Sequence, residues 1–150
     1  KNLLKKSEIF FEKKFKYIVD IEVTNPLINS GDLNNFTKSY FNKKKKYDGQ
    51  FCITPAKKNP YFNIMEYING KYLLSKKIRN IKITARQNAP KVFEHVGGLY
   101  YFKRNYLLQC KSLFQGKIFG FNVSLFKSFD IDSPLDFKLV ELLLKNKKNI

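Results

Sequence analysis

Two carboxylates separated by one residue stand in the segment Phe129-Asp130-Ile131-Asp132, near the C-terminal end of the sequence. In an extended chain Asp130 and Asp132 project to the same side, while Ile131 points the other way, into a core. Two carboxylates aimed at one point are the chemistry that a hard divalent cation requires. An isolated Asp-x-Asp pair is equally compatible with solvated loop residues.

A helix start follows this pair directly. Ser133 suits the N-cap, Pro134 suits the first helical position, and Asp136 completes a capping-box spacing before an apolar helix. Mg²⁺ takes one or two carboxylates together with phosphate oxygens, and a helix N-terminus also favours phosphate. The segment therefore predicts a site for a metal ion and a phosphate.

Two further segments contain polar residues that could bind a substrate. The first is Ala85-Arg86-Gln87-Asn88-Ala89-Pro90-Lys91-Val92-Phe93, followed by Gly97-Gly98-Leu99-Tyr100-Tyr101. The second runs from Asp20 to Leu27 and contains Thr24-Asn25-Pro26 after an apolar run. Strand-end loops of this kind are candidate binding sites.

Read together, these segments resemble the C-terminal part of the acylneuraminate cytidylyltransferases. The family pattern is roughly RQ-x-x-P-x-V-[YF], then N-[GA]-x-[IL]-Y, then D-I-D-[ST]-x-x-D, preceded by a strand and a T-S-P-L loop. The stretch Asn59-Pro60-Tyr61-Phe62-Asn63 is similar to a stretch in the members that activate legionaminate-like sugars. The resemblance spans almost the whole chain.

The resemblance implies a Rossmann-like α/β nucleotidyltransferase domain with a mixed sheet and an antiparallel hairpin that dimerises. Residues 1–150 would form one partial domain that lacks the N-terminal strands and the CTP-binding segment. The reaction implied is transfer of CMP from CTP to a nonulosonic (sialic-type) acid, with release of pyrophosphate. A homodimer in the bacterial cytoplasm is expected.

Roles for individual residues follow from the same resemblance. Asp130 and Asp132 would be catalytic residues that hold Mg²⁺. Arg86 and Gln87 would bind the acidic sugar or neighbouring phosphates.

Thr24 and Asn25 would line the substrate pocket. The planar guanidinium of Arg86 suits a carboxylate or phosphate, and an interface or surface ion pair is the alternative role for this residue.

Four departures from the family pattern bear on activity. Val96 replaces an Asn, Ile28 replaces an Arg, and Glu94 stands where some members have Arg. The basic, glycine-containing loop that binds CTP phosphates has no counterpart. By itself the chain is expected not to bind CTP productively.

Periodicity predicts an α/β layered domain. Helices are expected over residues 1–16, from a cap at Ser30, over 105–114 and after Ser133. Strands are expected over 17–23, which should be mostly buried, and over 50–54, 99–102 and 118–123. Asn69-Gly70 between 62–68 and 71–74 predicts a type I′ hairpin.

Composition narrows the function classes. The net charge of +17 comes from lysines scattered along the chain with three arginines, which argues against nucleic-acid readout, and the run Lys43 to Lys46 is expected to be a solvated helix end. No apolar run reaches the ~18 residues of a membrane span. Cys52 and Cys110 are expected to be buried free thiols.

Two alternatives remain open. A sugar-nucleotide glycosyltransferase also places an Asp-x-Asp metal motif after a strand. A truncated, inactive module that still dimerises is the non-enzymatic alternative. His95, the only histidine, is expected to be a structural or surface residue and not a base.

Overall fold

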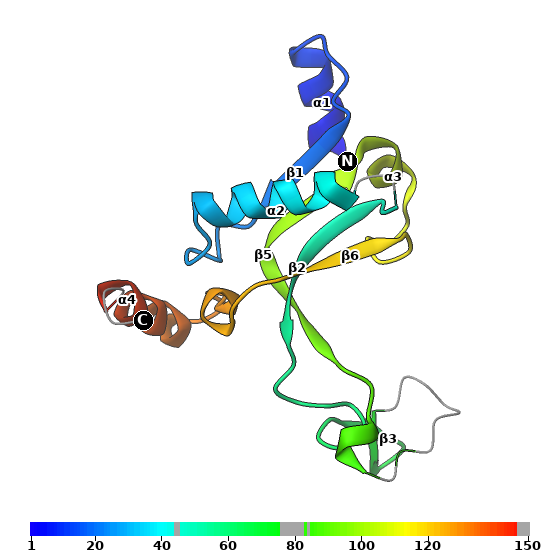
Figure 1. Ribbon diagram of the computed structural model, residues 1–150, viewed down its shortest axis with the longest axis vertical. Helices are drawn as coiled ribbons and strands as arrows, with labels where there is room; N and C mark the ends of the chain where they lie inside the picture. Colours follow the sequence, from blue (N-terminus) through cyan, green and yellow to red (C-terminus); the bar gives the residue numbers. More distant parts are fainter. Residues whose placement is uncertain (44–45, 76–82, 84, 147–150) are drawn as a thin grey trace. The chain divides into compact units, whose positions relative to one another are not determined.

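The computed structural model describes residues 1–43, 46–75, 83 and 85–146 (Figure 1). Contacts divide the chain into two compact units, one made of residues 1–54 and 95–150 and the other of residues 55–94. The expectation of one partial domain over residues 1–150, without a CTP-binding segment, stays a prediction.

The larger unit is built on a four-stranded sheet with the strand order β1-β5-β2-β6. The strands are β1 (Tyr17–Ile21), β2 (Gly49–Pro55), β5 (Phe93–Lys103) and β6 (Ile118–Asn122). β1 is antiparallel to β5, with Ile21 opposite Leu99, whereas β2 is parallel to β6. The predicted α/β class with a mixed sheet is therefore confirmed.

The core lies between this sheet and helix α2 (Ser30–Lys43), which runs along the sheet in Figure 1. Phe36 and Tyr40, the periodic apolar residues of the predicted helix, are fully buried. The Tyr40 ring lies 4.0 Å from that of Tyr101 on β5, centroid to centroid. Aromatic burial of this kind supplies much of the stability of a small core.

The cap of α2 differs from the prediction of Ser30. The Asn29 side chain accepts from the Asp32 backbone N–H at 3.0 Å, and the Asp32 carboxylate accepts from the Asn29 N–H at 2.9 Å. This reciprocal pair is a capping box in which Asn29 is the capping residue, one position before Ser30.

Two helices are shorter than predicted. Helix α1 covers Asn2–Phe10 because the chain turns at Glu12, whose φ is +47°, and the Phe15 backbone N–H then donates to the Glu8 carboxylate at 3.0 Å. Helix α3 covers Arg104–Gln109 and ends where Cys110 becomes extended. Residues 111–116 form turns instead of the predicted last helical turn.

Strand β1 is the other correction. It ends at Ile21 and lies at an edge of the sheet, so Val19 and Ile21 are 40% and 53% exposed. The expectation of a mostly buried strand over residues 17–23 is wrong, because β-rich composition does not report whether a strand has two neighbours.

The smaller unit contains the hairpin of β3 (Met65–Ile68) and β4 (Lys71–Leu74), paired antiparallel. Asn69 and Gly70 have φ values of +50° and +79°, as the two central residues of a type I′ turn require. The predicted hairpin is confirmed. A short 3₁₀ helix, η1 (Arg86–Asn88), follows in the same unit.

After β6 the chain passes through a second 3₁₀ helix, η2 (Leu125–Ser128), into α4 (Pro134–Lys145). The Ser133 side chain accepts from the Asp136 backbone N–H at 3.3 Å, which confirms the predicted N-cap. The Ser133 hydroxyl and the backbone N–H groups of Asp132 and Ser133 donate to the Asp136 carboxylate and lower its pKa.

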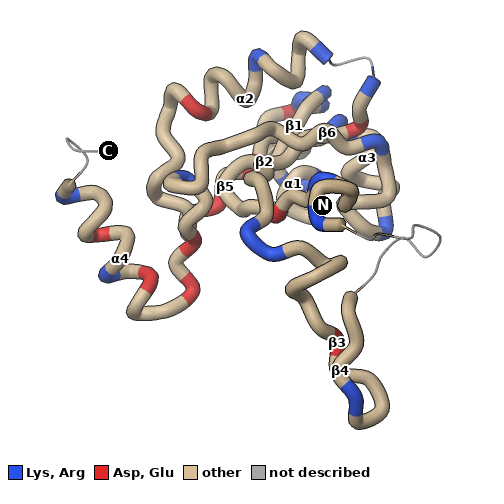
Figure 2. The backbone as a smooth tube through the Cα atoms, turned by 60° about the horizontal axis from the view of Figure 1, so that its bottom comes forward, with Lys and Arg blue, Asp and Glu red and all other residues tan. Residues whose placement is uncertain are grey.

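Other sequence expectations concern thiols, membranes and charge. Cys52 and Cys110 are free and buried, as predicted, and burial raises the pKa of the Cys52 thiol to about 11. Among the described helices, none has the length and hydropathy needed to cross a bilayer. Figure 2 shows basic positions spread along the chain.

An ion pair holds α1 to the start of α3. Nε and Nη2 of Arg104 donate to the two carboxylate oxygens of Glu8 at 2.5 and 2.7 Å. These bonds hold the pKa of Glu8 at about 2, below its ordinary value of 4.5. Because the folded-state pKa is the lower one, the carboxylate stabilises the fold above pH 4.5.

We therefore expect the free energy of unfolding to fall as pH drops from 4.5 towards 2. Glu8→Gln should lower the free energy of unfolding at neutral pH and should remove the contribution of Glu8 to this pH dependence. Urea unfolding over this pH range measures both effects. Glu12→Gln, at an exposed position, is the matched control. Parallel curves for wild type and Glu8→Gln would contradict the assignment.

Candidate functional site

The loop that leaves β1 is fastened to β5. The Glu22 backbone N–H donates to the Gly98 carbonyl at 2.9 Å, and the Gly98 N–H donates to the Glu22 carboxylate at 3.2 Å. Two turns follow within the loop, with Asn25 N–H to Glu22 carbonyl at 3.4 Å and Ile28 N–H to Asn25 carbonyl at 3.2 Å. The loop therefore has a fixed course from the end of β1 to α2.

This loop lies against the segment that carries the two aspartates. The Ile131 backbone N–H donates to the Thr24 carbonyl at 2.9 Å. Nδ2 of Asn25 donates to the carbonyl of Phe129 at 3.3 Å, across 104 positions of sequence. The structure thus brings together the segments of four predicted site residues, Thr24, Asn25, Asp130 and Asp132.

The two aspartates have different surroundings. One carboxylate oxygen of Asp130, Oδ1, is buried and has no hydrogen-bond partner among the described residues, whereas Asp132 is exposed. Both precede the N-terminus of α4, and Figure 2 shows several acidic positions along the chain there. An unsatisfied buried carboxylate oxygen carries a desolvation cost that a cation or a donor would offset.

The two carboxylates suit a Mg²⁺ ion that takes its remaining ligands from phosphate and water. In the described part of the chain, no three His, Cys, Asp or Glu side chains gather into a metal site. Mg²⁺ is commonly held by one or two carboxylates, with phosphate oxygens and waters completing the octahedron. Asp130 and Asp132 match that pattern, and their assignment as metal ligands stays a prediction.

Sequence reasoning missed Glu22. Besides the bond from Gly98, its carboxylate accepts a hydrogen bond from the Tyr100 hydroxyl. Burial, together with this bond to an anion, raises the pKa of Tyr100, so the phenol keeps its proton. The signal that could have found Glu22 is an acidic residue at the end of a β-rich run, directly before Thr24-Asn25.

Two glycines on β5 allow the side chains of the loop after β1 to approach the strand closely. A Cβ on Gly97 would collide with the Glu22 carboxylate and lie 2.7 Å from Oδ1 of Asn25. Gly98 has a φ of +100°, a backbone conformation that L-residues rarely adopt. The Gly97-Gly98 pair of the family-like motif is thus explained by close approach of the Asn25 and Glu22 side chains.

Arg86 and Gln87 lie on η1 in the smaller unit, and both are exposed. The Arg86 guanidinium carbon lies 6.0 Å from the ring centroid of Phe62. Their predicted contact with the sugar acid or phosphates stays a prediction.

The departures from the family pattern have local roles. Val96 is a member of the buried core cluster, and Ile28 packs against that cluster. Oε1 of Glu94 accepts a hydrogen bond from the Lys57 backbone N–H at 3.0 Å.

His95 lies among aromatic rings, with its ring centroid 4.7 Å from that of Phe51, and partial burial lowers its pKa. These packing contacts agree with the structural role expected for His95.

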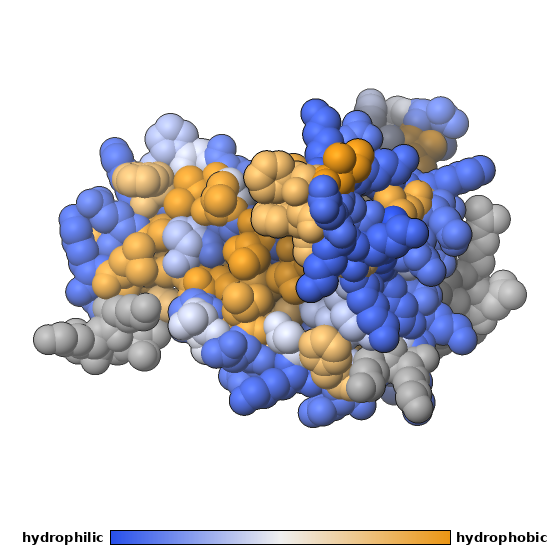
Figure 3. All heavy atoms as spheres, turned by 90° about the horizontal axis from the view of Figure 1, so that it is seen from above, coloured by the Kyte–Doolittle hydropathy of each residue, from blue (hydrophilic) through white to orange (hydrophobic). Residues whose placement is uncertain are grey.

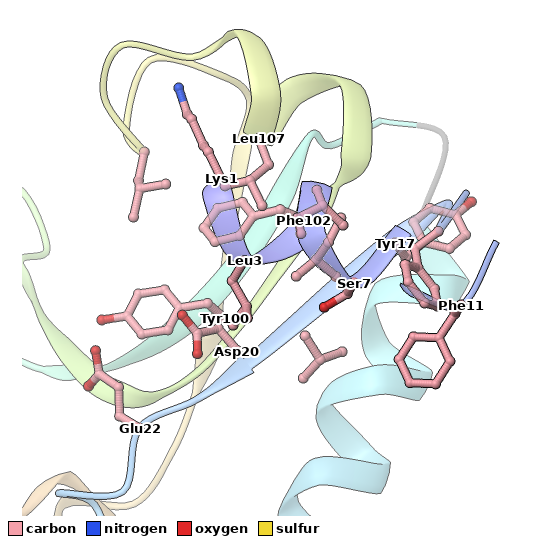
Figure 4. Close-up of a pocket in the computed structure, with 15 residues that line it drawn as sticks. Lys1, Leu3, Ser7, Phe11, Tyr17, Asp20, Glu22, Tyr100, Phe102 and Leu107 are labelled. Atoms are coloured by element: carbon pink, nitrogen blue, oxygen red, sulfur yellow. The ribbon is translucent and has the colours of Figure 1, made fainter. Parts of the chain in front are cut away.

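A cavity of about 550 Å³ opens beside this site, between α1, β1 and β5. Figure 4 shows Asp20, Glu22 and Tyr100 near one another in its lining, and Leu3, Phe11 and Phe102 supply apolar walls. Exposed hydrophobic side chains are also gathered on the face shown in Figure 3. Leu3, Phe10 and Phe11 of the α1 region are 77%, 81% and 62% exposed.

Comparison with known proteins gives two relatives. The chain is 36% identical over 152 residues to post-translational flagellin modification protein B of Campylobacter coli, covering 98% of this chain and 60% of that protein. It is 45% identical over 98 residues to CMP-N,N'-diacetyllegionaminic acid synthase of Campylobacter jejuni, covering 62% of this chain and 38% of the synthase.

No protein-family model matches the chain. The chain spans about 60% and 38% of the lengths of the two relatives. The name of the synthase agrees with the resemblance of the sequence motifs to acylneuraminate cytidylyltransferases and to their legionaminate-type members. The chain is therefore similar, over part of their length, to a CMP-legionaminate synthase and to a flagellin modification protein.

Proposed function

We propose that this chain forms part of a cytidylyltransferase that transfers CMP from CTP to a nonulosonic acid of the legionaminate type. The observation that carries the proposal is the contact of the Thr24-Asn25 loop with the Asp130-Asp132 segment, in a chain 45% identical over 98 residues to a CMP-legionaminate synthase. The two contacting segments are those that the family motifs assign to substrate and metal.

In the proposed reaction, the anomeric hydroxyl oxygen of the sugar acid attacks the α-phosphorus of CTP. The new phosphorus–oxygen bond forms as the bond to the bridging oxygen of the β-phosphate breaks, and pyrophosphate leaves. The hydroxyl proton passes to solvent. Such a transfer depends on alignment of the hydroxyl and neutralisation of the triphosphate more than on covalent catalysis.

Asp130 and Asp132 would hold Mg²⁺, whose charge offsets that of the phosphate oxygens. The unsatisfied oxygen of Asp130 and the adjacent N-terminus of α4 support this role. Thr24 and Asn25 would border the sugar acid, and Arg86 and Gln87 would bind its carboxylate or a phosphate.

The Rossmann-like fold is also proposed. The mixed sheet of the larger unit is compatible with part of such a fold. Since the chain spans 60% of the flagellin modification protein, the basic loop that binds the CTP phosphates in the family is proposed to lie outside these 150 residues, while Asp130 and Asp132 would supply the metal.

The proposed homodimer would use the hairpin. Met65, Tyr67, Tyr72 and Leu74 share one face of the two paired strands, and all are exposed. An isolated two-stranded hairpin is only marginally stable in water. Contact with a second copy would cover its exposed apolar face.

The reaction is tested by grafting. We expect the chain alone to form no CMP-sugar, and a graft that replaces the matching 152-residue region of flagellin modification protein B to form it from CTP and a legionaminate-type acid. Asp132→Asn in the graft should lower kcat roughly 100-fold, because about 3 kcal/mol of transition-state stabilisation is lost. Pyrophosphate release and chromatography of the product measure both.

Asp136→Asn is the matched control, since this carboxylate accepts a hydrogen bond from the Ser133 hydroxyl in the α4 cap. Equal turnover in the Asp132→Asn graft would exclude the metal assignment. Transfer from a preformed sugar nucleotide without CTP consumption would support the glycosyltransferase alternative.

The dimer is tested on the hairpin. Tyr72→Lys, on the apolar face, should weaken self-association at least ~10-fold, because a charge would have to be desolvated. Leu73→Lys, the next residue on the opposite face, should leave association unchanged. Analytical ultracentrifugation over a concentration series measures both, and a monomeric wild type would refute the hairpin interface.

A further inference from the structure

Three hydrogen-bonded contacts hold the chain between η2 and α4. On its N-terminal side, the Lys127 ammonium pairs with the Asp32 carboxylate of α2. On its C-terminal side, Ser133 and Asp136 form the cap of α4. Between them, the loop after β1 holds residues 129–131 through the Asn25 side chain and the Thr24 carbonyl, and we call this pair of bonds the Asn25 clamp.

The clamp acts on the main chain on both sides of Asp130. The Asn25 amide holds the carbonyl of the preceding residue, and the Thr24 carbonyl holds the N–H of the following residue. Fixing the two flanking peptide groups restricts the backbone dihedrals of Asp130, and those dihedrals set where its side chain points.

The orientation of the Asn25 amide is determined by its neighbours. Its Nδ2 faces the Phe129 carbonyl, an acceptor that requires a donor. Its Oδ1 is packed against Gly97 and Gly98, whose ideal Cβ atoms would lie 2.7 and 3.0 Å away. Asn25 is 3% exposed, and Oδ1 has no hydrogen-bond partner among the described residues.

A buried amide with an unsatisfied oxygen carries a desolvation cost, and the bond from Nδ2 to the Phe129 carbonyl is what this side chain contributes in return. We propose that Asn25 is a positioning residue that sets the direction of the Asp130 carboxylate for a divalent cation. This inference rests on the proposed function of the aspartate pair. It gives Asn25 a role distinct from contact with the sugar.

The same chain provides a matched control at a second buried amide. Nε2 of Gln50 donates to the Phe36 carbonyl at 2.9 Å, and Oε1 of Gln50 is buried without a partner among the described residues. Gln50 lies on β2, and its side chain bonds to α2 instead of to the segment that carries the two aspartates. Replacing either amide by an isosteric apolar side chain removes one buried donor to a main-chain carbonyl.

The experiment titrates the 150-residue chain with Mn²⁺ as a probe of the Mg²⁺ site, following free Mn²⁺ by electron paramagnetic resonance. Asn25→Leu should weaken Mn²⁺ binding at least ~10-fold, as loss of a residue that orients a metal ligand does. Gln50→Met should leave the Mn²⁺ dissociation constant within about twofold of wild type, although both variants lose a buried hydrogen bond. Thermal unfolding verifies that each variant is folded.

Asp130→Asn separates the two hypotheses. If it leaves Mn²⁺ binding unchanged, or if wild type binds no Mn²⁺, the metal site and the positioning role are both wrong. If Asp130→Asn weakens binding and Asn25→Leu does not, the metal site stands and the positioning role is overturned.

Equal weakening by Gln50→Met and Asn25→Leu would also overturn the positioning role, since general loosening would then explain both. Asn25→Ala serves as a second variant with the same expected loss if Asn25→Leu does not fold.

Discussion

The antiparallel pairing of β1 with β5 is the constraint on which the candidate site depends. Its register sets Ile21 opposite Leu99, and the next step along the two strands sets Glu22 beside Gly98. One face of β5 then contributes Leu99 and Tyr101 to the core, while Tyr100 reaches the Glu22 carboxylate. A slip of one residue would exchange these two faces, so core and site are specified by the same pairing.

Local chemistry made much of the fold predictable. The hairpin, the cap of α4 and the buried face of α2 each depend on residues within a few positions of one another, where turn and capping rules apply directly. The corrections have local causes too. Asn29 caps α2 in place of Ser30, and the turn at Glu12 ends α1 earlier than predicted.

The site was only partly predictable. Motif order pointed to Thr24, Asn25, Asp130 and Asp132, and the structure brings their segments together. The Asn25 clamp could not be predicted, because no periodicity or motif spacing in the sequence signals a hydrogen bond between an amide and a carbonyl that lie 104 positions apart. Glu22 was hidden for the same reason, since its partners lie on β5.

The two buried cysteines make the chain convenient for chemical labelling. Thiol reagents attack the thiolate, and a thiol with a pKa of about 11, as for Cys52, supplies almost none at neutral pH. Cys110 is 8% exposed. A cysteine introduced at an exposed hairpin position such as Lys71 would therefore react first. A single spin label there would report the distance between copies in the proposed dimer without removal of either native thiol.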